Sequence, residues 1–226
     1  MIVGERKPVD EVMKLVEPYE KILVLGCGTC VTVSFAGGDR EVSLLKSALN
    51  LKCKREGISK DFSGNTIKRQ CEREFFEPIT EEINQADAVL SLACGAGVQF
   101  LAELFPEKVI LPAVNTMFIG VNQDVGVWDE RCRMCGDCVL AETAAICPIT
   151  QCPKGLVNGP CGGTNNGKCE VDRQKDCAWT LIYRRLEKQG KLDNIRKVFA
   201  PKKHSAQLHP AVQVSECYEK AEMEGE

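Results

Sequence analysis

Cysteine spacing is the feature that most constrains this chain, because eight of its fourteen cysteines fall within residues 132–177. The first three form a C-x2-C-x2-C motif, and two later ones precede proline, at Cys147-Pro148 and Cys152-Pro153. A cubane iron–sulfur cluster needs four thiolates, and proline after a late cysteine is typical of bacterial ferredoxins. The pattern therefore predicts two [4Fe-4S] clusters. Their expected ligands are Cys132, Cys135, Cys138, Cys147, Cys152, Cys161, Cys169 and Cys177.

Zinc and disulfide bonds are the alternatives for such a dense group of cysteines. Zinc more often uses two separated C-x2-C pairs. Disulfide frameworks belong to small secreted domains, whereas this chain is long enough for a packed core and begins without an apolar run typical of a signal peptide. We therefore favour iron–sulfur clusters in a reducing cytoplasm. Spacing places Cys132, Cys135 and Cys138 on one cluster and leaves its fourth ligand open among the later five.

Composition excludes several classes of function. The net charge of -3 and pI of about 5.6 do not indicate nucleic acid as a partner. The longest apolar stretch, residues 88–98, is too short to span a bilayer. Only two histidines occur, His204 and His209, which removes most ways of building a Ser-His-Asp or Cys-His centre. We therefore expect no catalytic residues in this chain.

Residues 1–121 read as an α/β domain, a small parallel sheet flanked by helices in a Rossmann-like arrangement. After an amphipathic helix near residues 9–16, strands are expected at 22–25, 66–69, 88–93 and 109–111, with helical patterns between them. A loop-rich cysteine module should cover residues 122–200, with C-terminal amphipathic helices that begin after an Asp176 cap. Residues 201–226 form a polar tail that we expect to be mobile, and Cys217 in it should be a free thiol.

Four other cysteines follow expected strands: Cys27 and Cys30 the first, Cys71 the second and Cys94 the third. The carboxyl ends of parallel strands share one edge, where ligands collect, so these thiols predict a second metal site holding zinc or a third [4Fe-4S] cluster. Ordinary buried cysteines are the alternative, and Cys53 on a helix face is expected to be one. A dinucleotide site is disfavoured, because Val31 occupies the third glycine position of the fingerprint.

The basic outer face of the C-terminal helices can either be merely solvated or dock a partner. Its residues are Arg184, Arg185, Lys188, Arg196 and Lys197.

A longer string, from Cys147 to Leu186, resembles one family. Its main segments are C-P-K-G-L-V-N-G-P-C-G-G at 152–163, G-K-C-E-V at 167–171 and C-A-W at 177–179, followed by I-Y-R-R-L at 182–186. This string is similar to the methylenetetrahydrofolate reductase C-terminal-type domain, the small MetV subunit of acetogenic bacteria. The resemblance implies a larger partner subunit, a flavin-carrying barrel that binds the folate, and nothing in this chain corresponds to that barrel.

The resemblance implies an electron-transfer subunit in one-carbon folate metabolism that relays electrons to or from the partner's flavin, with room for further electron-transfer subunits. Glycine turns beside the ligands can aim N–H groups at cluster sulfurs. Two other functions stay open: a scaffold whose zinc or clusters have no redox role, and an accessory protein for methyl transfer to a corrinoid.

Overall fold

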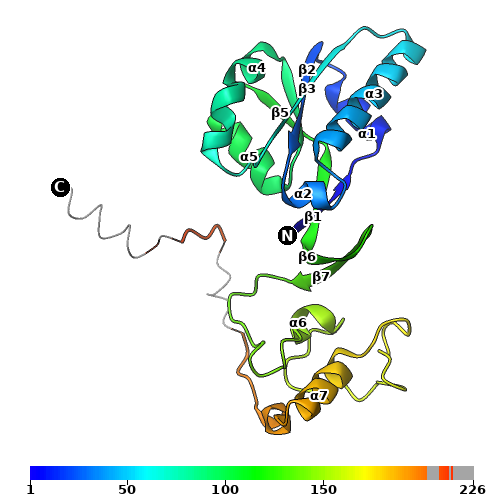
Figure 1. The fold of residues 1–226 in the computed structure, drawn as a ribbon, viewed down its shortest axis with the longest axis vertical. Helices are drawn as coiled ribbons and strands as arrows, with labels where there is room; N and C mark the ends of the chain where they lie inside the picture. Colours follow the sequence, from blue (N-terminus) through cyan, green and yellow to red (C-terminus); the bar gives the residue numbers. More distant parts are fainter. Residues whose placement is uncertain (203–208, 214, 216–226) are drawn as a thin grey trace, which may run out of the picture. The chain divides into compact units, whose positions relative to one another are not determined.

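The computed structural model describes residues 1–202, 209–213 and 215 (Figure 1). The chain falls into two compact units, Met1–Arg131 and Cys132–Glu226, here called the N-terminal unit and the cysteine unit. The predicted boundary at residue 121 lies within strand β6 (Val114–Asp124). Within the described ranges, no helix is long and apolar enough to cross a membrane.

The N-terminal unit is built on a four-stranded parallel sheet, as the sequence predicted. Its strands are β2 (Lys21–Cys27), β3 (Asp61–Ile67), β4 (Ala88–Leu92) and β5 (Val109–Pro112). Their order is β3-β2-β4-β5, and every neighbouring pair is parallel. From β2 the chain adds β3 on one side of the sheet and then β4 and β5 on the other side. The loops that follow β2 and β4 therefore flank a topological switch point.

Helices cover both faces of this sheet (Figure 1). The helices α1 (Val9–Val16) and α3 (Asp39–Glu56) pack on one face, against Ile22, Val24, Leu90 and Leu92. The opposite face carries Leu23, Leu25 and Val89 under the 3-10 helix η1 (Arg73–Ile79), α4 (Thr80–Gln85) and α5 (Gly95–Leu104). Because both faces are covered, β2 and β4 are continuous apolar runs.

Cys53 lies in the apolar core between the sheet and the helices α1 and α3, and it is 3% exposed, as predicted for a packing residue. The expected helix near Asp39 is present, but its cap is Gly38, whose N–H donates to the Glu41 carboxylate at 3.0 Å. Glu41 thereby closes the first turn in place of an aspartate cap.

The second strand was predicted in the wrong place. Strand β3 spans Asp61–Ile67, whereas the sequence reading put it at residues 66–69. It is an edge strand that pairs only with β2, and only Phe62 and Ile67 in it are buried. An edge strand with so few buried positions leaves little apolar periodicity to detect.

The structure adds a second sheet that the sequence analysis did not predict. It has the order β1-β6-β7 and contains β1 (Ile2–Arg6), β6 and β7 (Val127–Cys132). Strands β1 and β6 are antiparallel, with Ile2 opposite Ile119. The Trp128 ring of β7 packs edge-to-face against the Phe35 ring, with 5.4 Å between the ring centroids. Phe35 follows the short helix α2 (Cys30–Val33).

The cysteine unit has little regular structure: α6 (Pro148–Gln151), α7 (Ala178–Lys188) and the 3-10 helix η2 (Leu192–Arg196). Its core consists of five buried residues, Ala144, Ile146, Trp179, Ile182 and Leu186. The predicted α7 is present, but its N-cap is Cys177 and not Asp176. Asp176 instead pairs with Lys168 at 2.7 Å. Of the tail, His204 and Cys217 lie outside the described residues, and so does most of the segment predicted to be mobile.

Candidate metal centres

Strand ends bring three of the N-terminal cysteines to the same edge of the parallel sheet. Cys27 is the last residue of β2, Cys94 is the N-cap of α5 directly after β4, and Cys71 follows β3 by four residues. Because β2 lies between β3 and β4, these are three adjacent strand ends. Cys30 opens α2, three residues beyond Cys27.

Electrostatics show that the three thiols interact. The pKa of Cys71 is raised above its usual value, first by burial and then by the negative charges of Cys27 and Cys94. Thiolates that repel one another in this way are stabilised together only when a cation lies among them. The donor set therefore fits a metal that prefers thiolates, such as zinc or iron.

A buried polar network supports the same edge of the sheet. Gln70, immediately before Cys71, has no exposed surface. Its amide donates to the carbonyls of Leu25 at 2.9 Å and Gly26 at 3.1 Å, and its oxygen accepts from the Ser91 hydroxyl at 2.6 Å. Gln70 thus ties the β3–η1 loop to β2 and β4, close to where each strand reaches its cysteine.

In the cysteine unit, four of the eight predicted ligands line one small cavity, here called the cysteine cavity. These ligands are Cys152, Cys161, Cys169 and Cys177. The cavity measures about 20 Å³ and is bounded by the Trp179 side chain and by Pro153 and Pro160. Cys169 is buried, while Cys152 and Cys177 are partly exposed. Four soft donors around an apolar space fit a thiolate-bound metal group.

Cys177 is the best-prepared thiolate of this set. Burial opposes its ionisation, but hydrogen bonds outweigh burial and hold the pKa of the Cys177 thiol below its usual value. Those bonds come from the backbone N–H and hydroxyl of Thr180, the Thr164 hydroxyl and the Trp179 N–H. A cysteine at a helix N-terminus gains stability as thiolate from such donors and from the helix dipole.

Backbone N–H groups point at two other cysteine sulfurs, and one of them, at Gly163, lies in the glycine-rich turns that were expected to do so. Gly163 donates to Cys161 Sγ at 3.4 Å, and Met134 donates to Cys132 Sγ at 3.4 Å. Gly162 makes the first of these possible, because its φ of +81° is a conformation that favours glycine. Such N–H···S contacts are one means by which proteins tune cluster potentials.

The remaining predicted ligands precede the cavity in the chain. Cys132 ends β7, Cys135 and Cys138 follow in the adjacent loop, and Cys147 is the N-cap of α6. Among the residues that the structure describes, no three Cys, His, Asp or Glu side chains converge closely enough to hold one metal ion. The thiols therefore lie along one sheet edge and around one cavity, but they do not converge on one metal position. The metal assignment stays a prediction.

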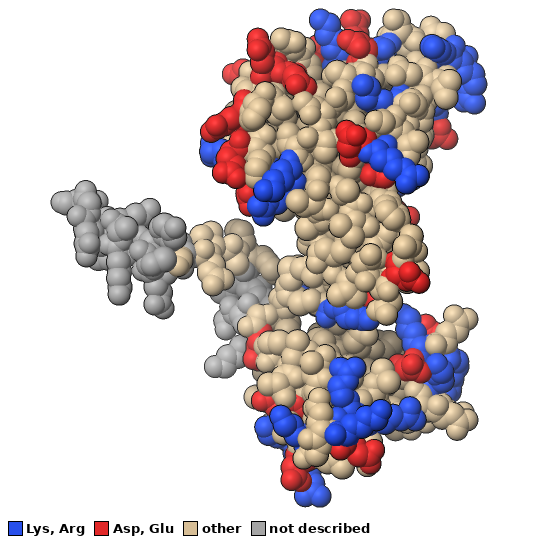
Figure 2. All heavy atoms as spheres, in the orientation of Figure 1, with Lys and Arg blue, Asp and Glu red and all other residues tan. Residues whose placement is uncertain are grey.

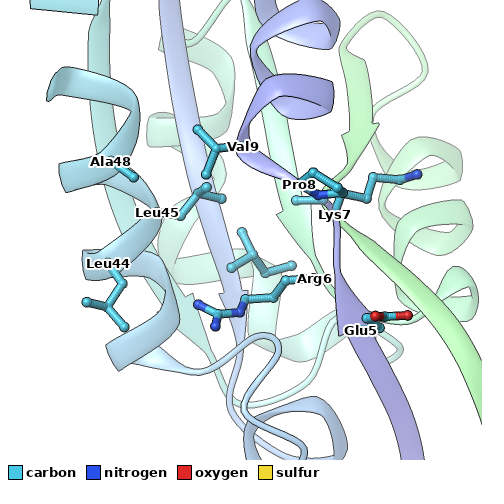
Figure 3. Close-up of a pocket in the computed structure, with 10 residues that line it drawn as sticks. Glu5, Arg6, Lys7, Pro8, Val9, Leu44, Leu45 and Ala48 are labelled. Carbon is cyan, nitrogen blue, oxygen red and sulfur yellow. The ribbon is translucent and has the colours of Figure 1, made fainter. Parts of the chain in front are cut away.

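A larger cavity lies elsewhere in the N-terminal unit and contains no cysteine (Figure 3). It measures about 560 Å³ and lies between α3 and the residues that join β1 to α1. Arg6 points toward α3 across this space, whereas Lys7 points away and pairs with Glu11. The lining is mostly aliphatic, with Glu5, Arg6 and Lys7 as the charged members.

Comparison with known proteins assigns the C-terminal half. Residues 111–205 match the family described as "Methylene-tetrahydrofolate reductase C terminal", and the match covers less than half of the chain. No curated protein and no solved structure matches the chain. The matched region holds β6, β7 and all eight cysteines from Cys132 to Cys177. Residues 111–205 are therefore similar to the methylene-tetrahydrofolate reductase C-terminal domain family.

Proposed function

We propose that this chain is the metal-binding, electron-transfer subunit of a methylenetetrahydrofolate reductase complex. It relays electrons to or from the flavin of a separate catalytic barrel subunit. The observation that carries this proposal is the cysteine cavity, because four predicted ligands spread over twenty-six residues line one space inside the matched region. The family match supports the choice of reaction, and the cavity lined by four thiols supports the proposed role within it.

The cavity also supports a division of the proposed ligands between two [4Fe-4S] clusters. Cys152, Cys161, Cys169 and Cys177 hold one of them. The other is held by the remaining four cysteines of the cysteine unit, Cys132, Cys135, Cys138 and Cys147. This division gives each cluster four thiolates and keeps the C-x2-C-x2-C motif on one cluster.

The reaction explains why such a subunit is useful. Reduction of a methylene to a methyl group takes two electrons at one carbon, which suits hydride transfer from a reduced flavin. A flavin also accepts electrons one at a time, so carriers of single electrons can feed it. When bound, the clusters supply this one-electron transfer. The residues of this chain hold them, shield them with Trp179 and the prolines, and direct N–H groups at the sulfurs.

Metal analysis of the full chain, expressed and purified without oxygen, tests the ligand assignment. We expect about eight irons with matching sulfide from the cysteine unit. Cys161→Ala and Cys169→Ala should each remove about four irons, and the double variant should remove no more than either one. Cys135→Ala should remove a different four. If Cys135→Ala and Cys161→Ala instead deplete the same cluster, the proposed division is wrong.

The N-terminal cysteines need a separate measurement, because zinc and a third [4Fe-4S] cluster both fit them. We expect Cys71→Ala to lower either the zinc content by about one ion or the iron content by about four. Cys53→Ala is the matched control, since Cys53 is buried in the core away from the strand ends. Equal metal content in wild type and Cys71→Ala would contradict a metal site at the N-terminal cysteines.

Electron relay itself is tested in the complex with the flavin subunit. Photoreduced clusters should pass electrons to the partner flavin at least as fast as turnover. Cluster-ligand variants that still assemble should lose activity with a one-electron donor.

A scaffold role is the second candidate, and one observation favours it. Among the described residues of the cysteine unit, the hydrophobic cluster contains only five buried side chains, so bound metal would supply much of its folding free energy. If the complex keeps full activity after its clusters are made redox-inert, the scaffold role stands and the relay fails.

A further inference from the structure

The outer face of α7 carries cations that pair with no acidic side chain in the described part of the chain. Arg184 and Lys188 are four residues apart on this helix, so they lie on the same face, and both are exposed. Lys191 follows just beyond the helix and is exposed as well. None of the three forms an ion pair with a described residue. The buried side of α7, formed by Trp179, Ile182 and Leu186, faces the core instead.

The charge of the whole cysteine unit points the same way. Residues 132–202 contain twelve lysines and arginines and seven acidic residues. Residues 1–131 contain fifteen lysines and arginines and twenty acidic residues. Five of the seven acids already pair with cations outside α7. Those acids are Asp137, Glu170, Asp172, Asp176 and Asp193. Part of the excess positive charge lies on α7, which carries Arg184, Arg185 and Lys188 against one acid, Glu187. Figure 2 shows Lys and Arg side chains gathered over this part of the cysteine unit.

The same surface has the composition of a protein interface. Tyr183 is 43% exposed and Leu181 is 36% exposed, and they lie on either side of Arg184 and Lys188 around the helix. Exposed tyrosine and arginine are enriched where proteins bind one another. An apolar margin beside unpaired cations fits an acidic protein surface better than it fits a small anion.

The surface also adjoins the cysteine cavity. Helix α7 begins directly after Cys177, which lines the cavity. One turn before Arg184, the Thr180 hydroxyl lies 3.4 Å from the hydroxyl of Thr164, another residue of the cavity wall. The Arg184 guanidinium lies close to Gly167: one of its nitrogens is 3.5 Å from the position that a Cβ atom on Gly167 would occupy. A protein bound to this face is thus placed beside four proposed cluster ligands.

We propose that the outer face of α7 docks the acidic surface of a small one-electron carrier protein. The inference rests on the proposed electron-relay function and names the partner class for it. One electron passes from the reduced carrier to the cysteine unit, and the carrier leaves oxidised. Electrostatic complementarity speeds such encounters, and interfaces between redox partners are small and short-lived.

Binding of an acidic two-cluster ferredoxin to the full chain, purified without oxygen, tests this proposal. We expect binding that weakens steeply as salt rises, since the screening length falls to about 8 Å at physiological ionic strength. Arg184→Glu with Lys188→Glu should weaken binding by about tenfold or more. The milder pair Arg184→Gln with Lys188→Gln should weaken it less. Glu187→Gln should strengthen it, because that change removes only repulsion.

The matched control is Arg173→Glu with Lys197→Glu, which changes the charge of the cysteine unit equally but leaves α7 intact. Both cations are exposed and lie outside α7. Equal weakening by the two double variants would show that overall charge, and not this face, determines binding. Absence of binding in the wild type, or equal binding of anionic phosphatidylserine vesicles with the same dependence on Arg184 and Lys188, would also overturn the proposal.

Reduction with dithionite separates this inference from the proposed function. Dithionite needs no docking surface, so clusters of the Arg184→Glu, Lys188→Glu variant should be reduced by it as in wild type while reduction by ferredoxin slows. If dithionite-reduced wild-type clusters fail to reduce the partner flavin, the relay function fails, whatever the ferredoxin affinity. If the relay works but ferredoxin reduces both proteins equally fast, only the docking inference fails.

Discussion

Replacement of Gln70 by leucine should strongly lower the free energy of unfolding of the N-terminal unit, although the two side chains are similar in size. Leucine has similar bulk but cannot donate to the Leu25 and Gly26 carbonyls or accept from Ser91. Gln70 and Ser91 have no exposed surface, so water cannot replace the lost bonds. A buried polar group left without its partner costs about 1–3 kcal/mol. Three affected groups, offset partly by leucine burial, give an expected loss of about 3–5 kcal/mol.

Urea unfolding of the full chain in a Trp179→Phe background measures this loss, since Trp128 then reports the N-terminal unit alone. Gln99→Leu is the matched control, because Gln99 is exposed and bonds only to the Gly95 carbonyl of its own helix. It should change the free energy of unfolding by less than about 0.5 kcal/mol. Ser91→Ala should cost about 1–2 kcal/mol, and the Gln70→Leu, Ser91→Ala double variant should cost less than the sum.

The reasoning fails if Gln70→Leu and Gln99→Leu have the same effect, or if the losses at Gln70 and Ser91 are strictly additive. Either result would mean that the three hydrogen bonds do not act as one buried network. The same variants report on the strand-end cysteines. Because Gln70 directly precedes Cys71 and ties its loop to β2 and β4, Gln70→Leu should also lower the amount of metal retained there after dialysis against a mild chelator.

Two further predictions concern individual cysteines. In metal-free protein, Thr180→Val should raise the pKa of Cys177 toward its ordinary value, because it removes the Thr180 hydroxyl that favours the thiolate and keeps the Thr180 backbone N–H. The alkylation rate of Cys177 as a function of pH measures this, and an unchanged midpoint would contradict the assignment. In wild type the depressed pKa contributes folding stability that is complete above the unfolded value near 9 and is lost as pH falls through the lower folded value. Cys53→Ala should leave metal content unchanged and cost about 1 kcal/mol in the free energy of unfolding, and a loss of metal would contradict its packing role.

Local sequence patterns predicted the parallel sheet because its central strands are buried on both faces. Residues 22–25 and 88–92 are unbroken apolar runs, and the helices between them repeat apolar residues at helical spacing. The β1-β6-β7 sheet has no such signature, since most positions of β6 are exposed. Its existence depends on the pairing of Ile2 with Ile119, a contact between distant residues that no local pattern encodes.

Cysteine spacing predicted which residues are candidate ligands, but not the groups that support them. Gln70 and Thr180 are ordinary polar residues in the sequence, and polar residues are mostly exposed in folded proteins. Their roles appear only when tertiary structure buries the Gln70 amide or directs the Thr180 hydroxyl at a sulfur. A buried glutamine directly before a proposed ligand is a signal that structure can give and sequence cannot.

The division of ligands between clusters shows the same limit more sharply, because it depends on how the loops close. Spacing alone left the fourth partner of Cys132, Cys135 and Cys138 open among five cysteines. In the folded chain, the Cys177 N–H donates to the Gly167 carbonyl at 2.8 Å and the Cys169 N–H donates to the Lys175 carbonyl at 3.0 Å. The Trp179 indole N–H reaches back to the Leu156 carbonyl at 2.8 Å and draws the loop after Cys152 onto α7. These three bonds help to bring cysteines that are distant in sequence to one cavity, and in the proposed division Cys147 completes the first set.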